Sequence, residues 1–304
     1  MNRITPISCL WIISVSLLLS TLLFSSCSNE VKNKPPIDSN LRILTYNVWY
    51  GFTEVPERKA LWLTWMKDQK ADIVFMQELN EYTPEKLKTD AATWGHQYSV
   101  LLKEGGFPTG MTSRFPIEEA QRFTEGFHHG LIRAMVNGIY YYTIHLHPSN
   151  WEFRKKEIDL ILADIGKLPS DANIVLAGDF NTFSPLDSSY YSHGLLEPFF
   201  EQRDEAYNEH NLNGGKLDYT ALIKLMDGGF VDIEHNMRKD GYIFTGSFPT
   251  LIEKPGDHGS NRRLDYVFAN DRLLQYVYQA SVIADDTTQF LSDHLPVIVD
   301  FRIN

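Results

Sequence analysis

The sequence predicts an α/β fold, because strand patterns and helix patterns follow one another along a chain of globular composition. Of the 304 residues, 43% are hydrophobic and 22% are charged, proportions that allow a packed core. The continuous aliphatic and β-branched run at 174–177 is typical of a strand buried on both faces. Apolar residues recur at helical spacing over 57–69. We expect one large α/β domain over residues 41–304.

Residues 1–26 have the pattern of a secretory signal. Arg3 precedes an apolar stretch over 7–24, and two small residues, Ser25 and Ser26, precede Cys27. Small residues directly before a cysteine resemble the lipobox of bacterial lipoproteins, in which that cysteine is lipidated. An uncleaved membrane anchor is the alternative, although the apolar run is barely long enough to span a bilayer.

Both interpretations of this segment predict an exported protein that is anchored to a bacterial membrane, in the periplasm or at the cell surface. Residues 27–40 form the next segment, which is polar, contains Pro35-Pro36 and lacks hydrophobic periodicity. We expect it to be a flexible tether.

Charge and cysteine content limit the kinds of site and ligand that the domain can have. Both cysteines, Cys9 and Cys27, lie in the targeting region, so we expect no disulfide, thiolate metal site or cysteine nucleophile in the domain. The net charge is −11, and residues 1–26 hold a single charged side chain, Arg3, so the remainder carries −12. Such a surface repels polyanions, which weighs against nonspecific binding of nucleic acid without excluding it.

The sequence of the first part of the domain predicts two units, each a strand followed by a helix. An alternating strand over 41–49 is followed by the helix over 57–69. A second, buried strand over 71–78 ends in a carboxylate and is followed by a helix over 83–94, which Thr83-Pro84 opens as N-cap and first residue.

Short strands separated by glycine and proline turns are expected next, at 98–102, 110–113, 117–123, 131–136 and 139–145. Asn137-Gly138, between the last two, is a strong signal for a two-residue hairpin. A helix over 151–165 and the buried strand over 173–177 follow.

Residues 184–260 are the least regular part of the chain. Only 217–226 has a helical pattern there, and the rest is rich in Gly, Asn, Asp and aromatic residues. Long irregular segments in a domain tend to be functional, so we interpret this region as the specificity surface. The remaining strands are expected at 262–268, 276–283 and 295–301.

Polar side chains recur where the predicted strands end. Asp179 and Asn181 follow the strand at 173–177, and in an extended chain they point the same way, so both can face one pocket. Ligands of open α/β sheets bind at this edge, although an Asx turn is the alternative for these residues. The whole set of polar residues at strand ends comprises Asn47, Glu78, His145, Asp179, Asn181, Asp265, Asp293 and His294.

These residues lie in six short segments, at 44–49, 76–78, 143–146, 178–181, 263–268 and 292–294. In content and order the segments resemble the endonuclease/exonuclease/phosphatase superfamily, which has the fold of pancreatic deoxyribonuclease. Each segment alone is weakly specific, but six in the family's order over about residues 41–304 are a specific signal.

The resemblance implies a four-layer α/β sandwich, in which helices flank two packed, largely antiparallel sheets. It also implies metal-dependent hydrolysis of a phosphoester, usually with Mg²⁺, while Mn²⁺ and Ca²⁺ are alternatives. Carried over by position, Glu78 is the implied principal metal ligand, supported by Asn47 and Asp293.

The resemblance implies catalytic roles for the other five residues. His294 is the implied base that activates the attacking water, with Asp265 holding its imidazole. Asp179 is implied to orient the nucleophile or to protonate the leaving oxygen. Asn181 and His145 are implied to hydrogen-bond the phosphoryl oxygens.

Physical chemistry independently favours these residue types for such a reaction. A phosphoester transition state spreads negative charge over its equatorial oxygens, which a hard cation bound by carboxylate and amide oxygens stabilises. Donors such as Asn181 and His145 complement the same charge. Histidine titrates near neutral pH, so His294 can accept a proton.

Purely structural roles remain open for several of these residues. Asp293-His294 could cap the strand that follows, and Asn47 could form an Asx turn. Asp265 could pair with Arg262 or Arg263.

Other histidines and aromatic residues are weaker candidates. His147 lies on the same strand face as His145, at a spacing that could bind zinc, and we take it as a substrate contact at most. His128-His129 and Asp257-His258 are expected in solvated loops. Aromatic residues near 46–50 and 242–248 could line a pocket or belong to the core.

The sequence therefore predicts an exported, lipid-anchored phosphoesterase that acts on a mono- or diester of a small molecule, an inositol phosphate or a lipid head group. A secreted endonuclease or exonuclease acting on DNA or RNA is the first alternative, which the acidic charge disfavours. A non-catalytic binding module on the same fold is the second. We expect a monomer.

Overall fold

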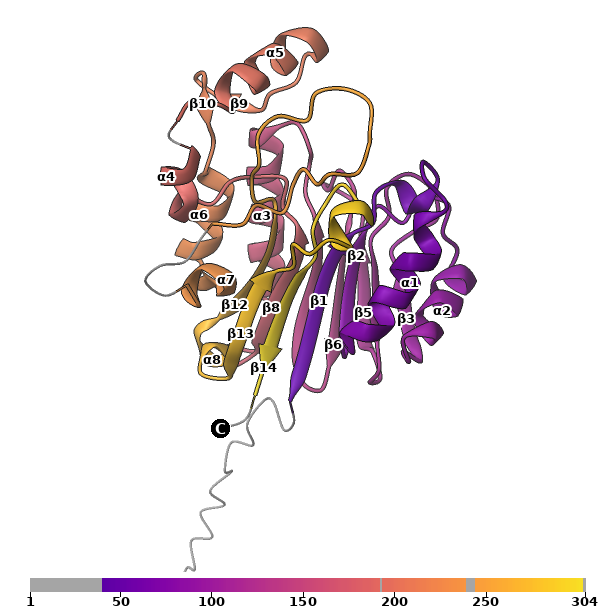
Figure 1. Cartoon of the computed structure of the whole chain (residues 1–304). Coiled ribbons are helices and arrows are strands. Elements are labelled where there is room, and N and C mark those ends of the chain that lie inside the picture. The colour runs from indigo at the N-terminus through magenta and orange to yellow at the C-terminus, as the bar shows by residue number, and fades with distance from the viewer. Residues whose placement is uncertain (1–39, 192, 239–243, 303–304) are drawn as a thin grey trace, which may run out of the picture. The chain divides into compact units, whose positions relative to one another are not determined.

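The computed structural model describes residues 40–191, 193–238 and 244–302. The predicted signal peptide, the lipidation site Cys27 and all but the last residue of the tether lie outside these ranges, as does Tyr242. Predictions made for them stay predictions. Within the described ranges, two six-stranded sheets pack face to face, with helices on their outer faces (Figure 1). This arrangement confirms the predicted four-layer α/β sandwich.

The first sheet is mixed, with one parallel pair among antiparallel neighbours. Its strand order is β13 (Val277–Val282), β14 (Val297–Phe301), β1 (Leu41–Asn47), β2 (Ile73–Gln77), β4 (Gly110–Ser113) and β3 (Tyr98–Leu101). β1 and β2 run parallel, because α1 (Arg58–Gln69) crosses between them on the outer face.

The second sheet has the same construction. Its strand order is β11 (Phe230–Asp232), β12 (Asp265–Asn270), β8 (Asn173–Asp179), β7 (Ile139–His145), β6 (Leu131–Val136) and β5 (Glu118–Phe123). β7 and β8 are its parallel pair, connected by α3 (Trp151–Ile165). Between β6 and β7, Asn137 and Gly138 both have positive φ, at 51° and 75°, as a tight two-residue hairpin requires.

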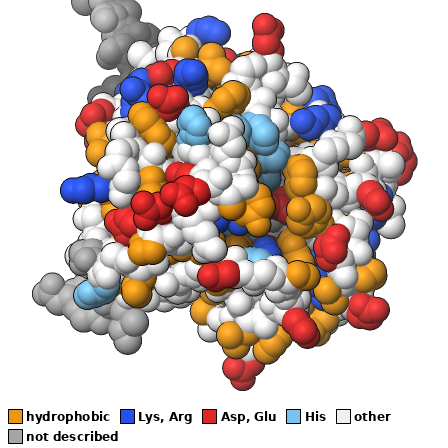
Figure 2. Space-filling view, turned by 90° about the horizontal axis from the view of Figure 1, so that it is seen from above, with side chains coloured by type: hydrophobic (Ala, Val, Ile, Leu, Met, Phe, Trp, Pro, Cys, Tyr) orange, Lys and Arg blue, Asp and Glu red, His pale blue; other side chains and the backbone are white. Residues whose placement is uncertain are grey.

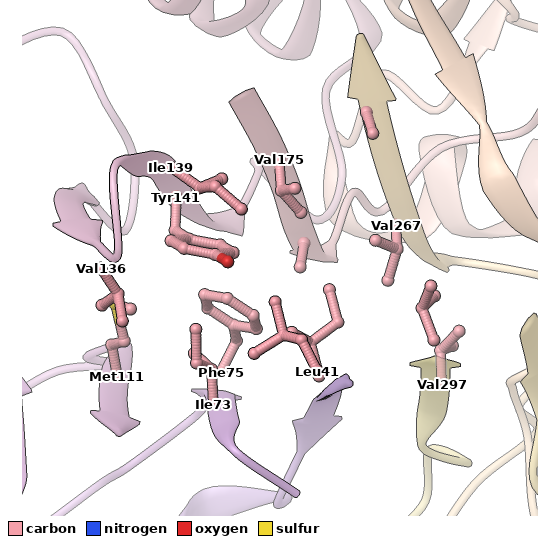
Figure 3. Close-up of a cluster of buried hydrophobic side chains, with 14 of the residues drawn as sticks. Leu41, Ile73, Phe75, Met111, Val136, Ile139, Tyr141, Val175, Val267 and Val297 are labelled. Atoms are coloured by element: carbon pink, nitrogen blue, oxygen red, sulfur yellow. The ribbon is translucent and has the colours of Figure 1, made fainter. Parts of the chain in front are cut away.

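Side-chain alternation divides each central strand between two cores. Ile73 and Phe75 of β2 face the second sheet, whereas Val74 and Met76 pack toward α1 and α2 (Pro84–Thr93). Figure 3 shows the core between the sheets, in which Phe75 faces Tyr141 at 5.7 Å between ring centroids. A third core packs α3 and α6 (Thr220–Asp227) on the outer face of the second sheet.

The region predicted to be irregular contains more structure than its sequence pattern indicated. Besides α6, it holds α4 (Ser188–Tyr191), α5 (Glu197–Tyr207), α7 (Ile233–Asn236) and the short strands β9 (Leu212–Asn213), β10 (Lys216–Leu217) and β11. α5 buries only Phe200, so it has no amphipathic stripe to recognise. The strand predicted at 262–268 begins only at Asp265, because residues 262–264 belong to the loop that precedes β12.

α8 (Asp271–Leu274) is the remaining α-helix of the described residues. Among the helices in these ranges, none combines the length and the apolar character that crossing a lipid bilayer requires.

Gly178 is essential for the close pairing of β7 and β8. Its φ is 150°, and a Cβ atom there would lie 2.0 Å from the carbonyl oxygen of Ile144. We expect Gly178→Ala to lower the free energy of unfolding by about 3 kcal/mol or more, since backbone must move. Urea unfolding followed by circular dichroism measures the change. Gly166→Ala, at the end of α3, is the matched control, because a Cβ atom there would lie 3.5 Å from its nearest neighbour, the carbonyl oxygen of Leu162. It should change stability by less than about 1 kcal/mol.

Candidate active site

The eight polar residues singled out from the sequence lie at one edge of the two packed sheets. Asn47, His145 and Asp179 end β1, β7 and β8, Glu78 follows β2, and Asn181 lies two residues beyond β8. Asp265 begins β12, and Asp293 and His294 precede β14. Because β12 and β14 run antiparallel to β8 and β1, their amino ends meet the carboxyl ends of those strands.

Six of these residues line a cavity of about 370 Å³, called the site cavity below. They are Glu78, His145, Asp179, Asn181, Asp293 and His294. Asn47 and Asp265 lie beneath its floor, at 0% and 1% exposure. Figure 2 looks onto this face and shows histidine side chains beside a hollow that holds charged groups and has hydrophobic side chains around it.

Asp179 connects the two sheets. Its Oδ2 atom accepts a hydrogen bond from the Asn47 amide at 3.1 Å, and its Oδ1 atom accepts one from the backbone N–H of Asn181 at 2.8 Å. Burial raises the pKa of Asp179 to about 7, although the nearby His294 imidazole opposes the rise. This carboxyl group can therefore exchange a proton near neutral pH.

His294 is held by a carboxylate from the opposite sheet. Its Nδ1 atom lies 2.7 Å from Oδ2 of Asp265, and its Nε2 atom lies 3.8 Å from Oδ2 of Asp179. Burial lowers the pKa of the imidazole, but the charges of Asp265 and Asp179 outweigh it and raise the pKa to about 10. The imidazolium form is thus favoured at neutral pH when no other cation is near.

Glu78 and Asp293 bring two acidic side chains to the other side of the site cavity. Glu78 accepts hydrogen bonds from the Asn47 amide at 3.1 Å and from the Tyr50 backbone at 3.0 Å. Its φ is 58°, a left-handed conformation that is rare for a residue other than glycine and that recurs at functional sites. Burial and the charge of Asp293 raise its pKa.

This donor set fits a hard divalent cation. The ionised form of Glu78, which the charge of Asp293 disfavours, is stabilised when a cation lies nearby, and Mg²⁺ prefers such carboxylate oxygen ligands. Asn47 lies beside Glu78, but its Oδ1 atom accepts the Trp49 N–H at 3.0 Å and its amide nitrogen faces the carboxylates. A role of Asn47 as a metal ligand stays a prediction.

A second group of acidic and imidazole ligand atoms lies next to this pair. Asp179, Asp265 and His294 each place one such atom within 4.8 Å of the other two. Because His294 and Asp265 already bind each other, Asp179 is the member of this group best placed to share a cation with Glu78.

One of the histidines outside the original set departs from expectation. His129 is only 5% exposed and stacks on His145, with ring centroids 3.9 Å apart, so its prediction as a solvated loop residue is wrong. His128, which is exposed as expected, contacts His129 and also lies 4.0 Å from the His147 ring. Burial lowers the pKa of His145 and lowers that of His129 to about 3, so this stack is neutral.

The geometry bears on the structural alternatives for three residues. Asp265 pairs with neither neighbouring arginine but contacts His294. Asn47 does accept the Trp49 N–H in an Asx turn, and it contacts the two carboxylates as well. Asn181 likewise combines both interpretations, since it closes an Asx turn with Asp179 and still lines the site cavity.

Two cationic residues near the site have no sequence signal. Lys254 forms an ion pair with Asp293 and lies over the Trp49 ring. Arg58 donates to the backbone carbonyls of Trp49 and Leu291 beneath the same side of the site. Both come from segments without a motif, so only their position in the fold identifies them.

Fold and site together define a class of protein: a two-sheet α/β sandwich with a buried acid–imidazole site that opens at one end of the packed sheets. The sequence matches the Endonuclease/Exonuclease/phosphatase family over residues 44–294, and the chain belongs to this family. The resemblance inferred from the six segments is thereby confirmed. No match was found among curated proteins.

Several solved structures have a similar fold. An AP endonuclease from Archaeoglobus fulgidus is 20% identical, with a TM-score of 0.59, over 86% of this chain and 100% of that chain. A humanized D. rerio TDP2 is 20% identical, with a TM-score of 0.60, over 87% and 100%. The 3′ phosphatase NExo from Neisseria, bound to a product DNA hairpin, is 18% identical, with a TM-score of 0.59, over 86% and 99%. At these identities the likeness shows the fold.

The donor set makes a prediction that does not depend on activity. A ligand present at about a hundred times its Kd stabilises a protein by about 2.7 kcal/mol, so Mg²⁺ should raise the midpoint of thermal unfolding. Glu78→Gln should remove most of this rise while leaving the metal-free protein at least as stable, because it removes a buried acid that faces Asp293. Glu209→Gln changes another acid of the same cavity and should keep the rise. An equal Mg²⁺ response of wild type and Glu78→Gln would refute the assignment.

Proposed function

We propose that this protein is an exported, lipid-anchored, Mg²⁺-dependent phosphoesterase that hydrolyses a small phosphate ester with a water activated by His294. The observation that carries the proposal is the buried Asp265–His294–Asp179 arrangement, which lies at the base of the same cavity as the acidic side chains of Glu78 and Asp293.

His294 has the geometry of a proton acceptor. Because Asp265 binds its Nδ1 atom, the proton that the imidazole exchanges with substrate is the one on Nε2. Asp265 also fixes the ring orientation. A cation near Glu78 and Asp293 would lower the pKa of His294 from about 10 toward neutrality, because like charges repel, and would make the neutral base available.

Asp179 and the neutral donors complete the site. The raised pKa of Asp179 suits a group that orients the attacking water or gives a proton to the leaving oxygen. Asn181 and His145 line the same cavity and can donate to phosphoryl oxygens. Glu78, with Asp293, would hold the divalent cation, which supplies Lewis-acid stabilisation of the charge on the phosphoryl group.

The shape of the site cavity favours a small substrate over a polymer. α5 contributes Phe199 and Phe200 to one wall, and Trp49, Tyr50 and Phe107 form another. A cavity of about 370 Å³ within such walls has room for a phosphorylated small molecule. The net charge of −11 further disfavours a polyanion.

Turnover tests this function directly. The domain from Asn40 onward is assayed with and without Mg²⁺ on p-nitrophenyl phosphate, bis(p-nitrophenyl) phosphate, sugar and inositol phosphates, sphingomyelin and supercoiled DNA. We expect Mg²⁺-dependent hydrolysis of a small ester, and a loss of about 10²–10⁴-fold in kcat in His294→Gln, since general acid–base catalysis contributes this much.

The controls separate the alternatives. His258→Gln alters a histidine that lines the same cavity without contacting the catalytic groups and should keep most of the wild-type rate. Preferred cleavage of DNA would replace this proposal with the nuclease. No turnover of any substrate, with Mg²⁺ binding intact, would favour the non-catalytic module.

The lipid anchor is tested separately from catalysis. In a bacterial host, the full chain should incorporate radiolabelled palmitate and sediment with membranes, because Cys27 directly follows two small residues. Cys27→Ala should lose the label, whereas Cys9→Ala should keep it. Labelling that survives Cys27→Ala would contradict the anchor and leave the catalytic proposal untouched.

A further inference from the structure

A buried arginine without an acidic partner lines the site cavity. Arg262 precedes β12 and is 5% exposed. Its Nη1 atom donates to the backbone carbonyls of His258 at 2.7 Å and Ser260 at 3.0 Å. Its Nε atom is buried without a hydrogen-bond partner, and no carboxylate among the described residues forms an ion pair with it.

The adjacent arginine shows one way in which this chain compensates a buried guanidinium. Arg263 is fully buried and forms ion pairs with Asp187, Asp232 and Glu234. These charges raise its pKa, whereas burial lowers the pKa of Arg262 to about 10. A buried charge without an acidic partner is costly. Arg58 and Arg154 are buried in the same way, but of these three arginines only Arg262 lines the site cavity, where a bound anion can compensate its charge.

Three aromatic rings surround the Arg262 guanidinium. Its Cζ atom lies 5.5 Å, 5.4 Å and 4.5 Å from the ring centroids of Phe199, Phe200 and Phe248. These rings exclude water from the cation and hold the guanidinium plane in place, which strengthens its attraction for an oxyanion. Two of the rings come from α5, the helix that closes this side of the cavity.

Phe248 also relates this cation to the catalytic groups. Its ring lies 4.8 Å from the His294 ring and 4.5 Å from Cζ of Arg262, so the cation is about one aromatic ring away from the proposed base. The other cations of the cavity wall are already paired: Lys254 with Asp293, and Arg203 with Glu209. Arg262 is therefore the cation of this wall that is available to a ligand.

We propose that Arg262, within the Phe199–Phe200–Phe248 box, binds a second oxyanion of the substrate, so that the enzyme prefers small phosphate esters that also carry a phosphate or a carboxylate. The proposal rests on the proposed function for the position of the reacting phosphate. It adds a specificity subsite on the far side of Phe248. A guanidinium recognises the planar fork of a carboxylate and the oxygens of a phosphate equally well by geometry.

Matched ligands test the subsite by binding, independently of turnover. Glucose 1-phosphate, glucose 1,6-bisphosphate and glucuronic acid 1-phosphate differ only at carbon 6, which is a hydroxymethyl group, a phosphorylated hydroxymethyl group or a carboxylate. Isothermal titration calorimetry in Mg²⁺ is carried out on the full-length His294→Gln protein, in which turnover is suppressed, and the Arg262 and Arg203 variants are made in the same protein. The two doubly acidic ligands should bind at least ~10-fold more tightly than glucose 1-phosphate, as expected for a desolvated charge-assisted contact.

Variants of Arg262 assign the preference to this residue. Arg262→Met keeps the packing length without the charge and should abolish the preference, whereas Arg262→Lys should retain part of it. Arg203→Met, on the same wall, should retain it fully. Which of the two acidic ligands binds more tightly identifies the oxyanion.

The outcomes are distinguishable from those of the catalytic proposal. Equal affinity of the His294→Gln protein with intact Arg262 for all three ligands would overturn the subsite, even if the Arg262 variants fail to fold. A preference that survives in a folded Arg262→Met would overturn it as well. A loss of turnover on every ester, with the ligand preference intact, would instead count against the proposed function alone.

Discussion

The buried carboxyl group of Asp179 is the contact on which the rest of the site depends. It ends a strand of the second sheet, yet it accepts a hydrogen bond from Asn47, which ends a strand of the first. A buried acid of this kind is costly without such partners, so the two sheet edges cannot separate here without a large penalty. The hydrogen bond between His294 and Asp265 crosses the same interface, but here the carboxylate belongs to the second sheet and its partner, the imidazole, precedes a strand of the first. Two independent polar contacts thus fix the spacing of the sheets at the point where the chemistry takes place.

The sequence predicted those parts of the fold and site that depend on local patterns. The strands β6 and β7 and the helix α3 were placed at their observed bounds, because alternation and helical spacing are visible within a few residues. The site residues could be named because parallel neighbours end at one edge, and because six segments matched a family in order. α5 was missed, since it covers the cavity with few buried residues. His129, Lys254 and Arg262 were missed as site residues because only long-range packing brings them to the cavity.

The loops that carry the acidic residues of the first sheet are held by contacts that no local pattern encodes. Arg58, the first residue of α1, donates hydrogen bonds to the carbonyls of Trp49 and Leu291. These bonds connect the loop after β1 to the loop before β14. Ser292 adds a hydrogen bond from its hydroxyl to the Asn47 carbonyl at 2.7 Å. Positions 49, 50 and 78 in these loops all have positive φ. This backbone conformation is unfavourable for residues other than glycine, so it persists only where surrounding contacts hold it in place. The hydrogen bonds of Arg58 and Ser292 do so here.

An acidic protein that binds an anionic substrate needs its positive charge inside the site. The net charge of −11 acts over the outer surface, where salt screens it within a Debye length of about 8–10 Å. Arg262 lies within the cavity, among aromatic rings that exclude water, where its charge is screened much less. A small ester held wholly inside the cavity experiences this cation, whereas a polymer extending from it also meets the acidic exterior. The distribution of charge therefore supports the proposal of a small phosphate ester, in size as well as in sign, on a fold that is also found in nucleases.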